Sequence, residues 1–178
     1  MEGTVVSINT RGMRPEGSPH LPFKLPASNG RLGQYGFRGD YHNQPTKRDF
    51  KNPGQTLPNT DRHVSVVALE VIDALNRELG LNMGPGTLGE NLTVRGMGDL
   101  SAIADNVRLL IVGHSGAPIC TLRVAEQNKP CKNLTLIHRE LPKRIMGRRG
   151  LLCAIETYDW SLGRSICAND TIQLIDPT

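Results

Sequence analysis

The chain has few aromatic residues and no long hydrophobic run, and both absences limit what it can be. Of its 178 residues, 38% are hydrophobic and 4% are aromatic. No apolar run approaches the ~18–20 residues that a membrane span requires. So few aromatic rings leave little surface on which nucleotide bases could stack, which disfavours a binder of single-stranded nucleic acid. We expect a soluble protein whose residues 1–178 form a single domain, because this length can bury a core without disulfides.

The four cysteines form no Cys-x-x-Cys pair, which excludes a zinc knuckle or a thioredoxin-like motif. They are Cys120, Cys131, Cys153 and Cys167. The segment 1–8 carries an acid where an export signal would carry cations, and it lacks a long apolar core. We therefore expect a cytoplasmic location and free thiols. No segment has the pattern of a flavin, haem or iron–sulfur motif, so electrons for any redox reaction would come from a separate protein.

Positive charge is concentrated in one part of the chain. Residues 123–149 contain eight basic and two acidic residues, a net charge of +6, so the remainder of a chain with a net charge of +4 carries −2. A basic segment around a cysteine suits an anionic ligand and favours a thiolate. A solvated basic face, or loose affinity for nucleic acid, is the alternative explanation of the same charges.

Hydrophobic patterns predict a mainly β protein with one clear helix. The helix is expected over 68–79, because Val71, Ile72, Leu75 and Leu79 share one face, with Gly80 at its C-terminal end. Alternating or β-branched segments predict strands at 3–8, 63–67, 92–95, 107–113, 118–125, 152–157 and 171–175. Their short, irregular spacing lacks the βαβ alternation of a parallel sheet. A β-barrel with one or two packed helices fits best, because closure removes exposed strand edges.

Two further stretches have weaker patterns. Residues 9–61 are rich in Gly, Pro, Asn and Arg with little periodicity, which favours an ordered cover over a site. Residues 131–145 have apolar side chains at helical spacing and predict a second helix, which Pro142 would break in its last turn.

Two segments about forty residues apart have the composition of a site. Residues 84–94 form a glycine-rich loop that brings Glu90 and Asn91 to the start of a strand, and Lys129-Pro130-Cys131-Lys132 places a thiol between two cations. Glu90 and Asn91 could line a pocket through hydrogen bonds to a heterocycle or a cation, or could belong to a structural turn. A single cytoplasmic cysteine is more often buried and inert than reactive.

Five segments resemble the MOSC family, the domain named after the C-terminal part of molybdenum cofactor sulfurase, in order and approximate spacing. They are Gly39-Asp40-Tyr41-His42-Asn43, Arg62-His63-Val64-Ser65, 84–92, Pro130-Cys131 and 163–172. The resemblance is clearest over 39–175, with 3–8 as a first strand. The chain departs from the family at Pro58-Asn59-Thr60, where many members have His-Gly-Gly, and at Asn169-Asp170 and Ala104-Asp105, where they have Gly-Asp. Asn169 is expected to keep a left-handed turn.

The resemblance implies a MOSC-like β-barrel in which Cys131 either ligates molybdenum in a pterin cofactor or carries sulfur as a persulfide. Both roles require a thiolate, and a soft sulfur ligand suits molybdenum. The residues expected around an anionic pterin are Gly89, Glu90, Asn91, Arg62, His63, Arg123, Lys129 and Lys132. Arg148 and Arg149 are expected to lie farther from the cofactor.

Three functions are compatible with these residues. The first is reduction of N-hydroxylated or N-oxide compounds by a bound molybdenum cofactor with an external reductase. The second is a persulfide carrier that receives sulfur from a donor protein and delivers it to a partner without turning over a substrate. The third, a basic nucleic-acid-binding module, accounts for the charge but for neither of the two motifs.

Overall fold

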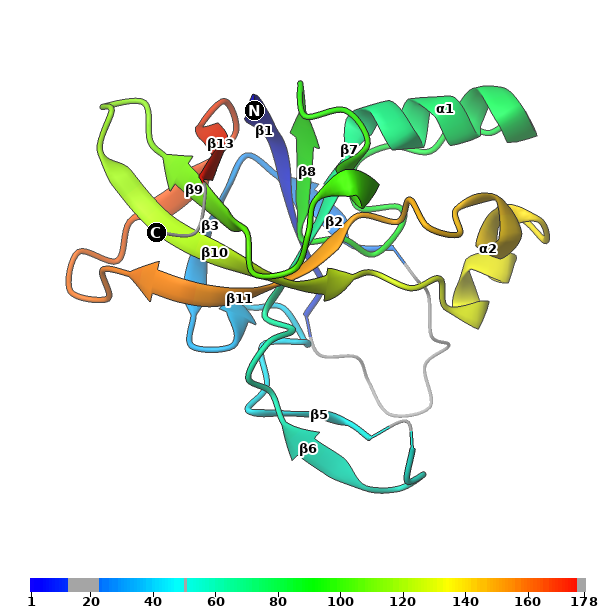
Figure 1. Ribbon diagram of the computed structural model, residues 1–178, viewed down its shortest axis with the longest axis horizontal. Coiled ribbons are helices and arrows are strands. Elements are labelled where there is room, and N and C mark those ends of the chain that lie inside the picture. Colours follow the sequence, from blue (N-terminus) through cyan, green and yellow to red (C-terminus); the bar gives the residue numbers. More distant parts are fainter. Residues whose placement is uncertain (13–22, 50, 176–178) are drawn as a thin grey trace.

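Seven β-strands close into a barrel in the computed structural model, which describes residues 1–12, 23–49 and 51–175 (Figure 1). Each strand pairs with the next around the barrel, and the last pairs with the first. In this order they are β13 (Thr171–Ile175), β9 (Arg108–Val112), β10 (Pro118–Gln127), β11 (Leu151–Tyr158), β7 (Val64–Ala68), β8 (Leu92–Arg95) and β1 (Glu2–Thr10). The prediction of a mainly β barrel is confirmed.

The barrel core consists of apolar side chains from alternate strand positions. In β9, for example, Leu109 and Ile111 are buried, while Arg108 is partly exposed. Period-two alternation places one face of each strand inside the barrel and the other outside. All seven barrel strands were predicted, with bounds that differ by at most two residues at either end.

The predicted first helix is present as α1 (Leu69–Leu79). Its apolar face buries Val71, Ile72 and Leu75, and Gly80 ends it in the left-handed conformation at φ 64°. The helix connects β7 to β8, which run parallel to each other. The sequence had not indicated any βαβ unit, and the structure corrects this: β7, α1 and β8 form one within an otherwise antiparallel barrel.

The predicted second helix is wrong as one element. Residues 131–145 instead contain a 3-10 helix, η2 (Lys132–Leu136), and one turn of α-helix, α2 (Leu141–Arg144). Pro142 lies in the first turn of α2 rather than the last. Proline is tolerated there because first-turn amides have no intrahelical acceptor, so it begins the helix instead of breaking it.

The stretch 9–61 contains short strands that the sequence did not reveal, and its residues 13–22 and 50 lie outside the described part. The unpredicted strands of this stretch are β2 (Leu25–Ala27), β3 (Asn29–Gly33), β4 (Gly36–Phe37), β5 (Thr46–Arg48) and β6 (Thr56–Pro58). Two further unpredicted elements lie elsewhere in the chain, η1 (Leu100–Ala102) and β12 (Ser165–Cys167). Strand β2 extends the barrel sheet beside β1, and β5 and β6 form a hairpin that projects below the barrel in Figure 1. Within the described ranges, no helix has the length and hydrophobicity needed to cross a membrane.

Candidate functional site

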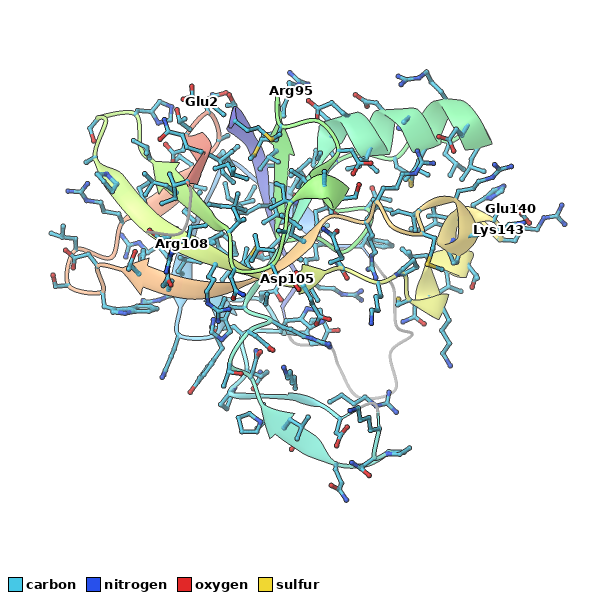
Figure 2. The ribbon with its side chains drawn as sticks, in the orientation of Figure 1. Glu2, Arg95, Asp105, Arg108, Glu140 and Lys143 are labelled. Atoms are coloured by element: carbon cyan, nitrogen blue, oxygen red, sulfur yellow. The ribbon has the colours of Figure 1, made fainter. Side chains whose placement is uncertain are left out.

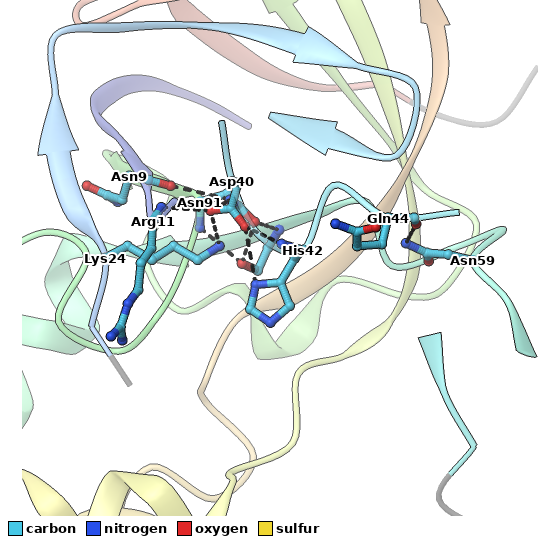
Figure 3. A network of polar contacts seen from close by, with 9 residues as sticks. Asn9, Arg11, Lys24, Asp40, His42, Gln44, Asn59 and Asn91 are labelled. Atoms are coloured by element: carbon cyan, nitrogen blue, oxygen red, sulfur yellow. Dashed lines mark hydrogen bonds and ion pairs between the residues drawn. The ribbon is translucent and has the colours of Figure 1, made fainter. Parts of the chain in front are cut away.

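A buried ion pair lies beside the barrel, between Lys24 and Asp40 (Figure 3). The Lys24 Nζ and Asp40 Oδ2 atoms are 2.9 Å apart, and the two side chains are 2% and 1% exposed. Asp40 also accepts hydrogen bonds from the backbone N–H groups of Arg11 and His42, at 3.2 and 2.9 Å. Burial alone would raise the pKa of Asp40, but the contacts with His42 and Lys24 lower it to about 2. Asp40 is therefore a stable buried anion.

Asn91 joins three segments at this ion pair. Its Oδ1 accepts hydrogen bonds from the backbone N–H and the hydroxyl of Ser65, at 3.2 and 3.1 Å. Its Nδ2 donates to Asp40 Oδ2 at 3.2 Å and to the Asn9 carbonyl at 3.3 Å. The side chain is buried, and both ends of its amide are bonded to protein. Asn91 therefore fixes the relative positions of β1, β7 and Asp40. Together with Lys24, Asp40 and Glu90 it forms the buried wall of the site.

The glycine-rich loop is wrapped around the carboxylate of Glu90. Glu90 is 1% exposed, and it accepts hydrogen bonds from Gly86 N–H at 2.6 Å, Leu88 N–H at 3.1 Å and the Thr93 hydroxyl at 2.7 Å. Burial raises the pKa of Glu90, and these hydrogen bonds oppose the increase. The loop amides at these positions thus point at Glu90. Gly89 has a φ of 82°, a left-handed conformation that turns the chain back toward Glu90.

Gly86 allows Lys24 to reach this loop. A side chain at position 86 would place its Cβ 2.4 Å from the Lys24 carbonyl oxygen, and Gly86 has a φ of 83°. The Lys24 N–H donates to the Gly86 carbonyl at 2.8 Å. The charges of Asp40 and Glu90 both raise the pKa of Lys24, against the larger lowering effect of burial.

Arg149 connects the glycine-rich loop to the Pro-Cys segment. Its Nη2 donates to the Leu88 carbonyl at 2.9 Å, and its Nη1 donates to the Lys129 carbonyl at 2.6 Å. Burial lowers the pKa of Arg149, while the charges of Cys131 and Glu90 raise it. Arg149 therefore belongs to the candidate site, although the sequence led us to expect Arg148 and Arg149 farther from the cofactor than the other basic residues.

Cys131 is the exposed cysteine of the four and directly precedes η2. Lys129 and Lys132, on either side of it, are exposed as well. Cys120 and Cys153 are buried in β10 and β11. Burial raises the pKa of both thiols, that of Cys153 to about 12. Cys167 is half-buried near the C-terminal turn, so accessible thiol chemistry is concentrated at Cys131.

His63 is bonded to protein at both ring nitrogens. Its Nδ1 accepts from the backbone N–H of Ile155 at 3.0 Å, and its Nε2 lies 2.9 Å from the Asn59 carbonyl. This arrangement suits a neutral ring that donates from Nε2, which connects β11 to the residues before β7. Arg62, next to it, forms an ion pair with Glu126, its Nη2 lying 2.6 Å from Glu126 Oε1.

Arg123 lies on the outside of the barrel, away from Glu90 and Asn91. It is opposite Arg108 across β9 and β10, and Arg108 projects from the barrel surface in Figure 2. Arg123 Nη1 donates to Asn106 Oδ1 at 3.3 Å. The structure therefore brings together Gly89, Glu90, Asn91 and the segment 129–132, and it places Arg123 elsewhere.

Sequence reasoning gave no role to Lys24, Asp40 or Arg149. Asp40 belongs to the segment 39–43 that resembles the MOSC family, and this was the one indication in the sequence that it could have a role. The sequence does not indicate a role for Lys24, because a lysine in a Gly- and Pro-rich stretch is expected to be exposed to solvent. Arg149 precedes Gly150, whose φ of 82° reflects a tight turn into β11. A glycine directly before a predicted strand could have marked its neighbour as fixed in place.

Two pockets formed by the described residues lie at the other end of β10. One, of about 280 Å³, includes Pro118 and Tyr158, and the other, of about 380 Å³, includes His114 and Asp170. Cys131, Glu90 and Asn91 line neither of them. Among the same residues, no group of three or more His, Cys, Asp or Glu side chains is placed to hold a metal ion. The candidate site is thus defined by its side chains and their charges.

Comparisons with known proteins agree with the fold and with the sequence motifs. The MOSC domain family matches residues 39–173. The YuaD protein from Bacillus subtilis has a similar structure, with a TM-score of 0.79 and 19% identity over 100% of this chain and 98% of that one. YiiM from Geobacillus stearothermophilus has a TM-score of 0.67 and 18% identity over 98% and 75% of the two chains. For YiiM from Escherichia coli the values are 0.64 and 16%, over 100% and 71%. A search of curated protein sequences finds no match.

Proposed function

Because this chain belongs to the MOSC domain family, we propose that it binds molybdenum cofactor and uses the Cys131 thiolate as a ligand to the metal. The observation that carries this proposal is that exposed Cys131 lies in the segment that Arg149 bonds to the glycine-rich loop. Metals bind the thiolate form of cysteine, and the sulfur of Cys131 is accessible to a ligand. Arg149 joins the two sequence motifs of the site, because its guanidinium donates to the carbonyls of Leu88 and Lys129.

The residues present fit such a cofactor. Molybdenum prefers soft ligands, and Cys131 offers an accessible sulfur. A pterin cofactor is anionic, and Lys129, Lys132 and Arg149 supply positive charge close to that sulfur. Glu90 and Asn91 could line the cofactor pocket or belong to a structural turn, and their buried hydrogen bonds to protein favour the structural role.

Each part of the site has a separate task in this proposal. Cys131 would hold the metal, and Arg149 holds the two loops together through its bonds to the carbonyls of Leu88 and Lys129. The buried Lys24–Asp40 pair and Asn91 keep the wall behind the loops rigid. When bound, the cofactor supplies two-electron chemistry of the kind that reduces N-hydroxylated or N-oxide compounds, with electrons delivered by an external reductase.

The exposure of Cys131 favours a second candidate, a sulfur carrier. An exposed thiolate can attack the outer sulfur of a persulfide on a donor protein. A new S–S bond then forms on Cys131, the S–S bond of the donor breaks, and the donor leaves as a thiolate with no net oxidation. Both candidates use the same sulfur, but only the first retains a metal.

Molybdenum and labile sulfur, measured together, distinguish the two. We would purify the wild type, Cys131→Ser and Cys167→Ser from cells that make molybdenum cofactor. The cofactor proposal predicts molybdenum in the wild type and in the half-buried control Cys167→Ser, and its loss from Cys131→Ser. Cyanide-labile sulfur on Cys131 without molybdenum would favour the carrier. Wild-type protein with neither would contradict both proposals.

A further inference from the structure

Three separate parts of the chain meet at the pocket of about 380 Å³ beside the turn between β9 and β10. That turn contributes His114 and Ser115, and the loop before β12 contributes Arg164. Strand β12 and the turn after it contribute Ser165, Cys167 and Asp170. Polar and charged side chains from all three parts therefore surround one small volume, apart from the segment around Cys131.

The lining of this pocket includes a buried carboxylate, that of Asp170. Asp170 is 1% exposed, and its Oδ2 accepts a hydrogen bond from the Cys167 N–H at 2.6 Å. Its Oδ1 lies 2.8 Å from His114 Nδ1. Its backbone carbonyl accepts a hydrogen bond from the Val5 N–H at 2.8 Å, which ties the turn to β1. Because both carboxylate oxygens have partners within the protein, Asp170 orients its neighbours and is not itself open to a ligand.

The contact with Asp170 determines which ring nitrogen of His114 can meet a ligand. A carboxylate only accepts hydrogen bonds, so Nδ1 is the nitrogen that donates to it. Nε2 has no hydrogen-bond partner within residues 1–12, 23–49 and 51–175, and the side chain is 60% exposed. In the imidazolium form Nε2 also donates, and the buried carboxylate balances the charge of the ring. A ring already held at one nitrogen loses little conformational freedom when it binds a ligand at the other.

Arg164 brings a positive charge to the same pocket. Its backbone carbonyl accepts a hydrogen bond from the Tyr158 hydroxyl at 2.7 Å, which holds the loop in place. Its guanidinium forms no hydrogen bond or ion pair with the part of the chain that the structure describes. The carboxylate of Asp159, in the same loop, accepts from the hydroxyl and N–H of Ser161 and from the N–H of Leu162. The five N–H donors of the guanidinium are therefore available to a ligand.

The groups in the pocket suit an oxyanion better than a metal ion. A guanidinium, an imidazole nitrogen and two serine hydroxyls can all donate hydrogen bonds, and the planar guanidinium matches the oxygens of a carboxylate or phosphate. His114, Cys167 and Asp170 are metal-binding residue types, but among the described residues no group of three is placed to hold a metal. The donors therefore point to a ligand that offers negatively charged oxygens.

We propose that this pocket is a second ligand site, which binds a small organic molecule through a carboxylate or phosphate group. Arg164 and His114 bind the oxyanion, and Ala117 and Ile119 contact the organic part. A volume of about 380 Å³ lies within the range of small-molecule pockets, about 300–1,000 Å³. Cys131 does not line this pocket, so the proposal is independent of the molybdenum and sulfur roles proposed above.

The test is a titration of the full chain followed by the NMR chemical shifts of its backbone amides, at about pH 6 and constant ionic strength. The probes are phenyl phosphate and benzoate, with benzylamine as the cationic control. At least one of the two acids should give saturable shifts at residues 113–119 and 164–170, and the acid that binds more tightly identifies phosphate or carboxylate as the group recognised. Absence of saturable shifts with both acids up to about 20 mM would overturn the proposal, and so would equal binding of benzylamine.

Substitutions at the two exposed binding residues make the test specific, because neither side chain belongs to the core. Arg164→Gln should weaken binding of the preferred acid about tenfold, and His114→Ala about threefold. Arg77→Gln, on the exposed face of α1, removes the same charge and should leave the affinity within about 1.5-fold of wild type. Equal affinities for Arg164→Gln and wild type would overturn the proposal. A loss of the same size in Arg77→Gln would also overturn it, because general charge attraction would then account for the binding.

Discussion

The wall around Asn91 and the segment around Cys131 lie next to each other but hold their polar groups in different ways. In the wall, Lys24, Asp40, Glu90 and Asn91 are all buried, and each is bonded to other parts of the protein. In the segment 129–136, Cys131, Lys129 and Lys132 are exposed. Arg149 touches both regions. Changes in the wall should therefore affect stability, whereas changes in the segment should affect chemistry and leave the fold intact.

The largest expected effect is that of Asp40→Asn. It leaves the Lys24 ammonium buried without its partner, which should lower the free energy of unfolding by about 3–5 kcal/mol. Urea denaturation at neutral pH measures this loss. As a control, the double substitution Lys24→Met with Asp40→Leu should recover much of it, because neither charge then remains buried. A single variant as stable as wild type would show that the pair is not part of the rigid wall.

Asn91→Ala comes next. It removes hydrogen bonds to Ser65, Asp40 and the Asn9 carbonyl, all buried, so we expect a loss of about 2–3 kcal/mol. The exposed Asn82→Ala should change stability by less than about 0.5 kcal/mol. Thermal melting of both variants makes the comparison. A strong loss of cofactor binding with unchanged stability would instead place the Asn91 amide in the pocket.

Acid should weaken the wall through Asp40. The pKa of its carboxyl falls from an ordinary value of 3.8 to about 2, so its contribution is present above the ordinary value and is lost as the pH falls through the folded one. This shift corresponds to about 2 kcal/mol, lost between about pH 4 and pH 2. Urea midpoints across this range should drop more steeply for wild type than for Asp40→Asn. Parallel curves would mean that Asp40 does not titrate in this way.

The smallest effect on stability is expected for Cys131→Ser. Because the side chain is exposed, serine should cost less than about 0.5 kcal/mol. Cys153→Ser buries a hydroxyl in the barrel core and should cost about 1–3 kcal/mol. Chemical denaturation of the two variants gives the contrast. An unfolded Cys131→Ser protein would indicate that this cysteine is a core residue.

Strands and turns of the barrel could be predicted because their signals are local. Alternating apolar residues fixed the barrel strands, and Gly80 marked the end of α1. Asn169 was expected in a left-handed turn, and its φ of 71° confirms this. Near Ala104-Asp105 the positive φ falls on Asn106, at 67°, because Asn tolerates that conformation better than Ala. The short strands between residues 23 and 58 have no such signal, since they gain order from their partners.

The wall of the site could not be predicted, because its contacts join residues distant in sequence. Asn91 and Asp40 are 51 positions apart, and Arg149 and Leu88 are 61 apart. The composition of residues 84–94 indicated a site but did not reveal that the loop amides turn inward to Glu90. Arg148 and Arg149 are chemically identical in the sequence. In the structure Arg148 bonds Glu78, whereas Arg149 bonds the carbonyls of Leu88 and Lys129.

The most direct test of the account is a map of cysteine labelling in the native protein. The central claim is that Cys131 is the one cysteine of the four placed for chemistry, in front of a rigid wall. Brief alkylation at near-neutral pH, followed by peptide mapping, should modify Cys131 first and Cys167 more slowly, while Cys120 and Cys153 react only after unfolding. If Cys131 reacts no faster than the two buried thiols, the claim is contradicted, and neither the metal ligand nor the sulfur carrier retains its chemical basis.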